Sequence, residues 1–133
     1  AKLVELCGEA AKAEGASAVC QIANELFPKG FAVAGTEVAI TKFKDLAEKA
    51  GALHAKVLKT FAGFHTPLMK PAQEKVGAEL DKMLPYMKPP RCTVYMNATA
   101  TPMKPGSNPK EIVKLLKKQL TSPVLWEPSV RAM

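Results

Sequence analysis

The sequence has few of the residues and patterns that mark several classes of protein. Its 133 residues include only 3 cysteines, with no CxxC pair, and 2 histidines. Three cysteines are too few for a disulfide-rich scaffold, so we expect buried free thiols and a reducing compartment. No His/Cys spacing typical of a zinc site occurs, so no bound metal is expected. No apolar run approaches the ~18–20 residues of a membrane-spanning helix, so no membrane span is expected either.

Arginine and aromatic residues are also scarce, although the chain is basic. Its 19 lysines and arginines exceed its 12 acidic residues, giving a net charge of +7, yet only Arg91 and Arg131 are arginines. Basic chains attract nucleic acids, anionic lipids or acidic proteins. Nucleic-acid-binding modules use arginine-rich patches and stacking aromatics, and aromatics are only 6% here. We therefore interpret the lysines as solvated helix faces and expect no nucleic-acid partner. An RNA- or membrane-surface-binding domain using the lysines of residues 110–118 is an alternative, but it lacks the usual aromatic strand motif.

What is present indicates a globular protein with a real core. Apolar residues make up 47% of the chain and charged residues 23%, which is ordinary for a folded domain. The length allows one domain or part of a larger one. Helical periodicity is already present at Ala1 and is still present at Met133, so we expect a fragment of a longer protein.

Hydrophobic periodicity in the first half predicts a mixed unit of helices and strands. Leu3, Cys7 and Ala10 recur at helical spacing, and Thr36 is placed to cap a second helix. The expected elements are a helix at 1–14, strands at 18–23 and 31–34 around a loop at 24–30, a helix at 36–50 and a strand at 53–59. With one further strand in front, this order is the βαββαβ unit of ferredoxin-like domains, and we assign it to residues 1–62.

The second half, residues 63–133, begins at a strong helix start. Thr66 can cap the helix and Pro67 suits its first position, while Pro71 should bend or delay it. The expected elements are this helix up to about residue 83, a linker at 86–90, a strand at 92–96, a long loop at 97–108, a helix at 109–120 and a further segment from Ser122. The overall class is therefore α/β or α+β with short elements.

Candidate chemistry is sparse, and one residue stands out. No serine lies in a GxSxG nucleophile elbow, and no glycine-rich phosphate loop occurs. His65, in contrast, lies at a junction just before a helix N-terminus, where the helix dipole disfavours the imidazolium. A neutral imidazole can act as a general base. The alternative is a partly buried junction histidine that bonds to a backbone carbonyl.

Four motifs together carry a resemblance to a known family. They are GFHTPLM at residues 63–69, NELFP at 24–28 followed by VAG at 33–35, YMNA at 95–98, and QLTSPVLW at 119–126. In this order and at this spacing, the chain resembles the malonyl-CoA:acyl-carrier-protein transacylases, which are acyltransferases of fatty-acid synthesis.

The resemblance implies an α/β fold with an α+β insert. Residues 1–62 would be the ferredoxin-like subdomain without its first strand, and residues 63–133 would be part of the α/β-hydrolase-like acyltransferase core. The reaction implied is ping-pong: a serine takes malonyl from CoA and passes it to the phosphopantetheine thiol of the acyl carrier protein, and the position of the catalytic base falls on His65. Asn24 and Asn97 fall on substrate-binding positions. The serine, the arginine that binds the malonyl carboxylate and the oxyanion segments fall before Ala1, and a turn that helps orient the histidine falls after Met133.

Further implications concern partners and location. Malonyl-CoA and the acyl carrier protein are the expected partners, with no bound cofactor and with a larger assembly left open. Leu26 and Gly30 stand where many bacterial members carry asparagine and glutamine, a departure that resembles the eukaryotic organellar branch. We therefore expect a mitochondrial or plastid protein. The alternative function is a non-catalytic acyltransferase-fold subunit of a larger assembly.

Overall fold

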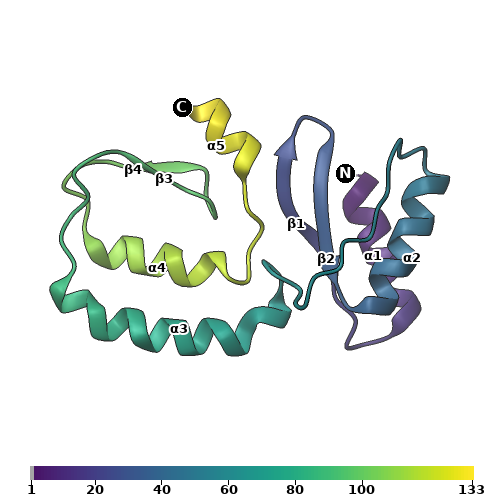
Figure 1. Ribbon diagram of the computed structural model, residues 1–133, viewed down its shortest axis with the longest axis horizontal. Helices are drawn as coiled ribbons and strands as arrows, with labels where there is room; N and C mark the ends of the chain where they lie inside the picture. The colour runs from purple at the N-terminus through teal and green to yellow at the C-terminus, as the bar shows by residue number, and fades with distance from the viewer. Residues whose placement is uncertain (1) are drawn as a thin grey trace.

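The computed structural model describes residues 2–133, and its first half is a β-hairpin with two helices packed on it. The elements are α1 (Lys2–Glu14), β1 (Cys20–Phe27), β2 (Gly30–Gly35) and α2 (Glu37–Lys49). The two helices pack against each other, and α1 also packs on β1 (Figure 1). Both helices and the position of the second strand are as the sequence predicted.

The hairpin is longer than predicted, because residues 24–27 belong to β1 and not to a loop. The two strands pair antiparallel from Cys20 with Gly35 to Phe27 with Gly30, with irregularities after Ile22 and after Glu25. Pro28 and Lys29 alone make the turn, and Lys29 takes a positive φ of 67°. Gly35 is required where β2 ends, because a Cβ there would come within 1.8 Å of the carbonyl oxygen of Val19.

The predicted strand at residues 53–59 is wrong. In the part of the chain that the structure describes, β1 and β2 form a two-stranded sheet and residues 53–59 take no regular structure. A strand requires a neighbour to take its backbone hydrogen bonds, and none lies beside this segment. Its side chains are open to solvent instead: Leu53 is 93% exposed, and Phe61 just beyond it is fully exposed.

The second half contains three helices and a small hairpin, which lies above the first two of these helices in the view of Figure 1. A 3₁₀ turn, η1 (Pro67–Met69), leads into α3 (Lys70–Met83) and a second turn, η2 (Leu84–Tyr86). The hairpin β3 (Val94–Met96) and β4 (Thr101–Met103) follows, and then α4 (Pro109–Gln119) and α5 (Trp126–Ala132). The predicted delay at Pro71 is confirmed, because the α-helix begins only at Lys70. The predicted loop at 97–108 is wrong in part, because it contains β4.

The two halves are joined through β1. Asn24 forms a parallel bridge with Val124, in which the amide of Glu25 donates to the Val124 carbonyl (2.9 Å) and the Val124 amide donates to Ala23 (2.8 Å). Helix α5 packs on the same strand. The segment that follows α4 therefore lies along the outer edge of the hairpin.

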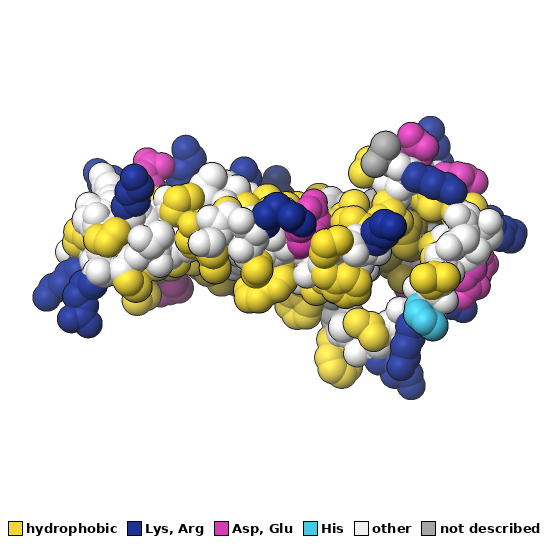
Figure 2. All heavy atoms as spheres, turned by 90° about the horizontal axis from the view of Figure 1, so that it is seen from above, with side chains coloured by type: hydrophobic (Ala, Val, Ile, Leu, Met, Phe, Trp, Pro, Cys, Tyr) yellow, Lys and Arg dark blue, Asp and Glu magenta, His cyan; other side chains and the backbone are white. Residues whose placement is uncertain are grey.

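Small residues fill the interior, while many large apolar side chains lie open. The buried apolar residues include Cys7, Ala10, Ala39 and Val113. Figure 2 shows hydrophobic side chains gathered over much of the face seen from above. The aromatic side chains with more than half of their surface exposed are Phe27, Phe61, Phe64, Tyr86 and Trp126, and Leu53 and Leu58 are exposed to a similar degree. None of the helices in residues 2–133 combines the length and apolar character that crossing a membrane requires.

The cysteines are free, as predicted, but they are not all buried. Cys7 is buried, Cys20 is half-buried and Cys92 is exposed. Although distant in sequence, Cys7 and Cys20 meet where α1 packs on β1. Their thiol–thiol hydrogen bond lowers the pKa of Cys7 and raises the pKa of Cys20, which burial also raises.

The cap of α2 comes from a residue that the sequence did not indicate. Thr36 occupies the N-cap position as predicted, but its side chain does not bond to the helix amides. The carboxylate of Glu14, at the end of α1, instead accepts from the Ala39 amide (2.9 Å) and from the Thr36 hydroxyl. A carboxylate at a helix N-terminus also interacts favourably with the helix dipole.

Replacing Glu14 with alanine should therefore reduce the free energy of unfolding by about 1 kcal/mol, the usual value of an N-terminal cap. Urea denaturation followed by circular dichroism measures it. Glu9→Ala, an exposed glutamate on the same helix, is the matched control and should change stability much less. Equal stability of Glu14→Ala and wild type would contradict the role of Glu14 as the cap.

Candidate active site

His65 lies in a tight turn that Thr66 fixes in place. Thr66 is fully buried; its hydroxyl donates to the Gly63 carbonyl (2.6 Å) and accepts from the Leu68 amide (3.3 Å). The predicted cap at Thr66 is thus confirmed, on η1. The backbone of His65 takes a positive φ of 60°. Such a conformation costs ~1–3 kcal/mol for a residue other than glycine and is concentrated at functional sites.

The imidazole of His65 is oriented by a backbone carbonyl at the end of α4. Its Nδ1 lies 2.8 Å from the carbonyl oxygen of Gln119. Since a carbonyl only accepts, Nδ1 carries a proton, and in the neutral form of the ring Nε2 then carries the lone pair. This bond to a backbone carbonyl is the one expected of a structural junction histidine. It is also compatible with a general base, which needs only its other nitrogen to accept a proton.

A second contact holds the backbone of the same residue. The side-chain amide of Gln21, on β1, donates to the His65 carbonyl oxygen over 2.9 Å. His65 is thereby tied to the hairpin through its backbone and to α4 through its ring. Two contacts from separate elements restrict both the position of the residue and the direction of its imidazole.

Asn97 reaches the site through the same glutamine. The side-chain amide of Asn97 donates to Oε1 of Gln119 (3.3 Å), and the backbone carbonyl of Asn97 accepts from the backbone amide of Leu125 (2.8 Å). Gln119 therefore contacts His65 with its backbone and Asn97 with its side chain.

Asn24, on β1, lies beside Val124 of the segment that follows Gln119. Its Oδ1 is buried and has no hydrogen-bond partner in residues 2–133. A buried acceptor without a donor is costly. Among residues 2–133, the side-chain oxygen of Asn24 is therefore left unsatisfied.

The sequence interpretation missed two residues of this site. Gln119 stands inside the QLTSPVLW motif, so a signal existed, although the orienting group was expected beyond Met133. Gln21 carried no signal, because its contact crosses 44 residues. Among residues 2–133, no three side chains of histidine, cysteine, aspartate or glutamate gather where they could hold a metal ion.

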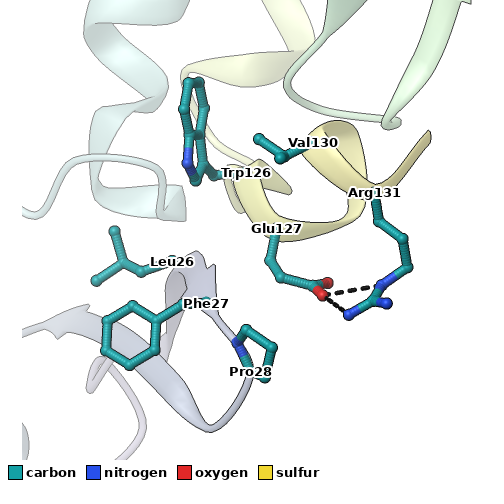
Figure 3. Close-up of a pocket in the computed structure, with 7 residues that line it drawn as sticks. All are labelled: Leu26, Phe27, Pro28, Trp126, Glu127, Val130 and Arg131. Atoms are coloured by element: carbon teal, nitrogen blue, oxygen red, sulfur yellow. Dashed lines mark hydrogen bonds and ion pairs between the residues drawn. The ribbon is translucent and has the colours of Figure 1, made fainter. Parts of the chain in front are cut away.

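An apolar groove lies between the hairpin tip and α5. Leu26, Phe27 and Pro28 face Trp126 and Val130 across a space of about 340 Å³ (Figure 3). The ion pair between Glu127 and Arg131 borders the groove on the α5 side. The groove is open, and Phe27 and Trp126 expose more than half of their surface.

Known proteins with similar sequences share one name. No protein-family model matches the chain. It is 33% identical over 115 residues to the human mitochondrial malonyl-CoA-acyl carrier protein transacylase, covering 86% of this chain and 28% of the relative. It is 32% identical over 133 residues to the malonyl CoA-acyl carrier protein transacylase of Escherichia coli K12, covering 100% and 40%. The chain thus spans well under half the length of the curated relatives it matches.

Solved structures agree with the sequences. A malonyl-transacylase in complex with its type II polyketide-synthase acyl-carrier protein is 26% identical to the chain, with a TM-score of 0.84 over 98% of this chain and 39% of that one. The α/β fold is therefore that of the transacylases. By sequence and by fold, the chain is similar to a part of the malonyl-CoA:acyl-carrier-protein transacylases, well under half of their full length.

Proposed function

We propose that these residues supply the general base of a malonyl-CoA:acyl-carrier-protein acyltransferase of fatty-acid biosynthesis. The observation that carries the proposal is the 2.8 Å contact between Nδ1 of His65 and the Gln119 carbonyl, which leaves Nε2 free to accept a proton. The relatives' names supply the reaction class. Carbonyl-oriented imidazoles with one free nitrogen are well suited to activate hydroxyl and thiol nucleophiles.

The reaction proceeds in two balanced steps. Nε2 of His65 takes the proton of a serine hydroxyl, the serine oxygen attacks the thioester carbon of malonyl-CoA, and the departing CoA thiolate receives that proton. The phosphopantetheine thiol of the acyl carrier protein then gives its proton to Nε2 and attacks the serine ester, and the serine oxygen recovers the proton as the ester breaks. Malonyl-CoA and the carrier thiol are substrates, and no resident cofactor takes part. The chain has no GxSxG serine, so in this proposal the serine comes from residues outside the 133.

The two asparagines take substrate-positioning roles in this proposal. Asn97 and His65 both contact Gln119. The contact of the Asn97 side chain is therefore coupled to the orientation of the His65 imidazole. The unpartnered Oδ1 of Asn24 suits a donor from the substrate or from the nucleophile segment.

The finer architecture follows the same proposal. Residues 1–62 form a ferredoxin-like subdomain and residues 63–133 form part of an α/β-hydrolase-like acyltransferase core. The order α1-β1-β2-α2 supports this division, as does the exposed segment 53–61, which a further strand would pair. Three curated relatives named mitochondrial, of human, mouse and fruit fly, favour a mitochondrion over a plastid.

The direct test is covalent loading of the full-length protein that contains these residues. Incubation with malonyl-CoA should add the mass of one malonyl group, as measured by intact-protein mass spectrometry. Addition of phosphopantetheinylated carrier protein should remove that mass from the enzyme and add it to the carrier. A full-length protein that is folded and gains no malonyl group would support the non-catalytic alternative instead.

A further inference from the structure

Helix α4 ends at the residue whose carbonyl orients the candidate base. Gln119 is the last residue of α4, and the last four carbonyls of an α-helix have no amide partner within the helix. The carbonyl of Gln119 accepts from Nδ1 of His65 over 2.8 Å. The direction of the imidazole therefore depends on how firmly the end of α4 is held.

The backbone alone holds this end loosely. Helices often end at a glycine that closes the last turn, but Leu120, Thr121 and Ser122 follow Gln119. The amides of these three residues donate to the carbonyls three positions back over 3.4, 3.2 and 3.5 Å. These distances are long, because N–H···O bonds are most often ~2.9–3.0 Å. The position of this turn therefore depends on contacts from outside the helix.

Gln73 of α3 supplies such a contact on both sides of Gln119. Its side-chain amide donates to the Lys117 carbonyl (2.8 Å) and to the Thr121 hydroxyl oxygen (3.0 Å). An amide nitrogen carries two protons, so it can make both bonds at once. The two acceptors stand two residues before and two residues after Gln119. One side chain thereby spans the residue that orients His65.

A separate link joins the same two helices. The ammonium of Lys117 pairs with the carboxylate of Asp81 on α3 over 2.6 Å. This ion pair holds the side chain of Lys117, whereas Gln73 holds the backbone of the same residue. The effect of Gln73 on the last turn of α4 can therefore be separated from the packing of α3 on α4.

We propose that Gln73 is a positioning residue for the general base, an inference that rests on the proposed function. By fixing the last turn of α4, Gln73 aims the Gln119 carbonyl at Nδ1 of His65. The hydrogen bond at one imidazole nitrogen decides which of the two nitrogens carries the proton in the neutral ring. Gln73 thus sets the tautomer of His65 and the direction of Nε2, and it does so through Gln119.

The first test reads the tautomer of His65 without any catalysis. Full-length protein is labelled with ¹⁵N-histidine, and multiple-bond ¹H–¹⁵N spectra are recorded at a pH where the ring is neutral. The signal that is missing from His65→Asn belongs to His65. The wild type should carry the proton on Nδ1. Gln73→Met has a similar length but no donor, so we expect it to show a mixture of the two tautomers.

The second test is kinetic. Gln73→Met should lower kcat for malonyl loading by ~10–10²-fold, because misplacement of a catalytic group by ~1 Å costs up to the larger factor, and it should leave the KM for malonyl-CoA nearly unchanged. Thr121→Val removes one of the two acceptors and should have a smaller effect of the same kind, while Thr121→Ser keeps the hydroxyl and should restore wild-type values. Asp81→Asn is the matched control: it removes the other link between α3 and α4 and should change neither the tautomer nor kcat.

The outcomes distinguish this proposal from the proposed function. A folded Gln73→Met variant with the wild-type tautomer and kcat would overturn the positioning role. Equal changes in Asp81→Asn would overturn it as well, since Gln73 would then act only through the packing of α3 on α4. If Gln73→Met does not fold, the comparison of Thr121→Val with Thr121→Ser decides by the same two measurements. If the wild-type protein loads no malonyl group, the proposed function fails, while the tautomer still tests the role of Gln73.

Discussion

Replacing His65 with alanine in the full-length protein should slow malonyl loading by ~10²–10⁴, the usual contribution of a general base. The loss should fall on kcat, with the KM for malonyl-CoA nearly unchanged, because Nε2 acts on the proton transfer and not on CoA recognition. Single-turnover loading followed by mass spectrometry measures the rate constant directly. The same variant should also slow transfer to the carrier, since one nitrogen serves both steps.

Two controls separate the chemistry from the unusual backbone at this position. His65→Asn tolerates the positive φ but cannot act as a base. It should therefore lose activity like the alanine variant while keeping a wild-type melting temperature. His54→Ala changes the other histidine, which is exposed in the irregular segment, and should leave both steps unaffected. If His65→Asn loaded malonyl at a rate near that of wild type, His65 would not be the base.

The elements that sequence predicted well are those that local pattern determines. The apolar residues of α1, α2 and α4 recur every three or four residues, and Pro67 and Pro71 affect only the helical turn in which each lies. Strands depend on distant neighbours, which explains the errors at residues 24–27 and 53–59. Residues 24–27 become strand because β2 and Val124 flank them. Residues 53–59 do not, because no other segment of residues 2–133 pairs with them. The cap of α2 was missed for the same reason, since Glu14 is 25 residues from the amide that it binds.

The candidate site also has a part that local sequence predicts and a part that depends on distant contacts. His65, Asn24 and Asn97 stand in recognisable motifs, so their positions could be named in advance, although their roles stay predictions. The partners that give the histidine its direction could not be named. Gln119 reaches it across 54 residues through a backbone atom, which any residue type possesses. Local sequence therefore identifies the candidate base, and tertiary contacts decide whether it is oriented to work.

Gln21 provides the sharpest test of that last point. We expect Gln21→Leu to lower kcat by up to ~10², because misplacement of a catalytic group by ~1 Å costs about that factor. Leucine has a similar size but cannot donate to the His65 carbonyl, which then loses its 2.9 Å contact. With the backbone of His65 released from the hairpin, the imidazole keeps its ring contact to Gln119 but loses its fixed distance to the nucleophile. The KM for malonyl-CoA should change little, so a steady-state split of kcat and KM reads the effect.

A loss of stability alone must be distinguished from this positioning effect. Glu14→Ala removes the hydrogen bonds that Glu14 makes at the N-terminus of α2, none of which involves His65, so it should lower the melting temperature and leave kcat unchanged. Gln21→Glu is a second variant of nearly the same shape: its carboxylate cannot donate at neutral pH, so it should resemble leucine. If Gln21→Leu and Glu14→Ala reduced kcat equally, Gln21 would be a structural residue. A kcat loss confined to the Gln21 variants would instead mean that the hairpin sets the position of the base, and that residues 1–62 contribute directly to the chemistry of residues 63–133.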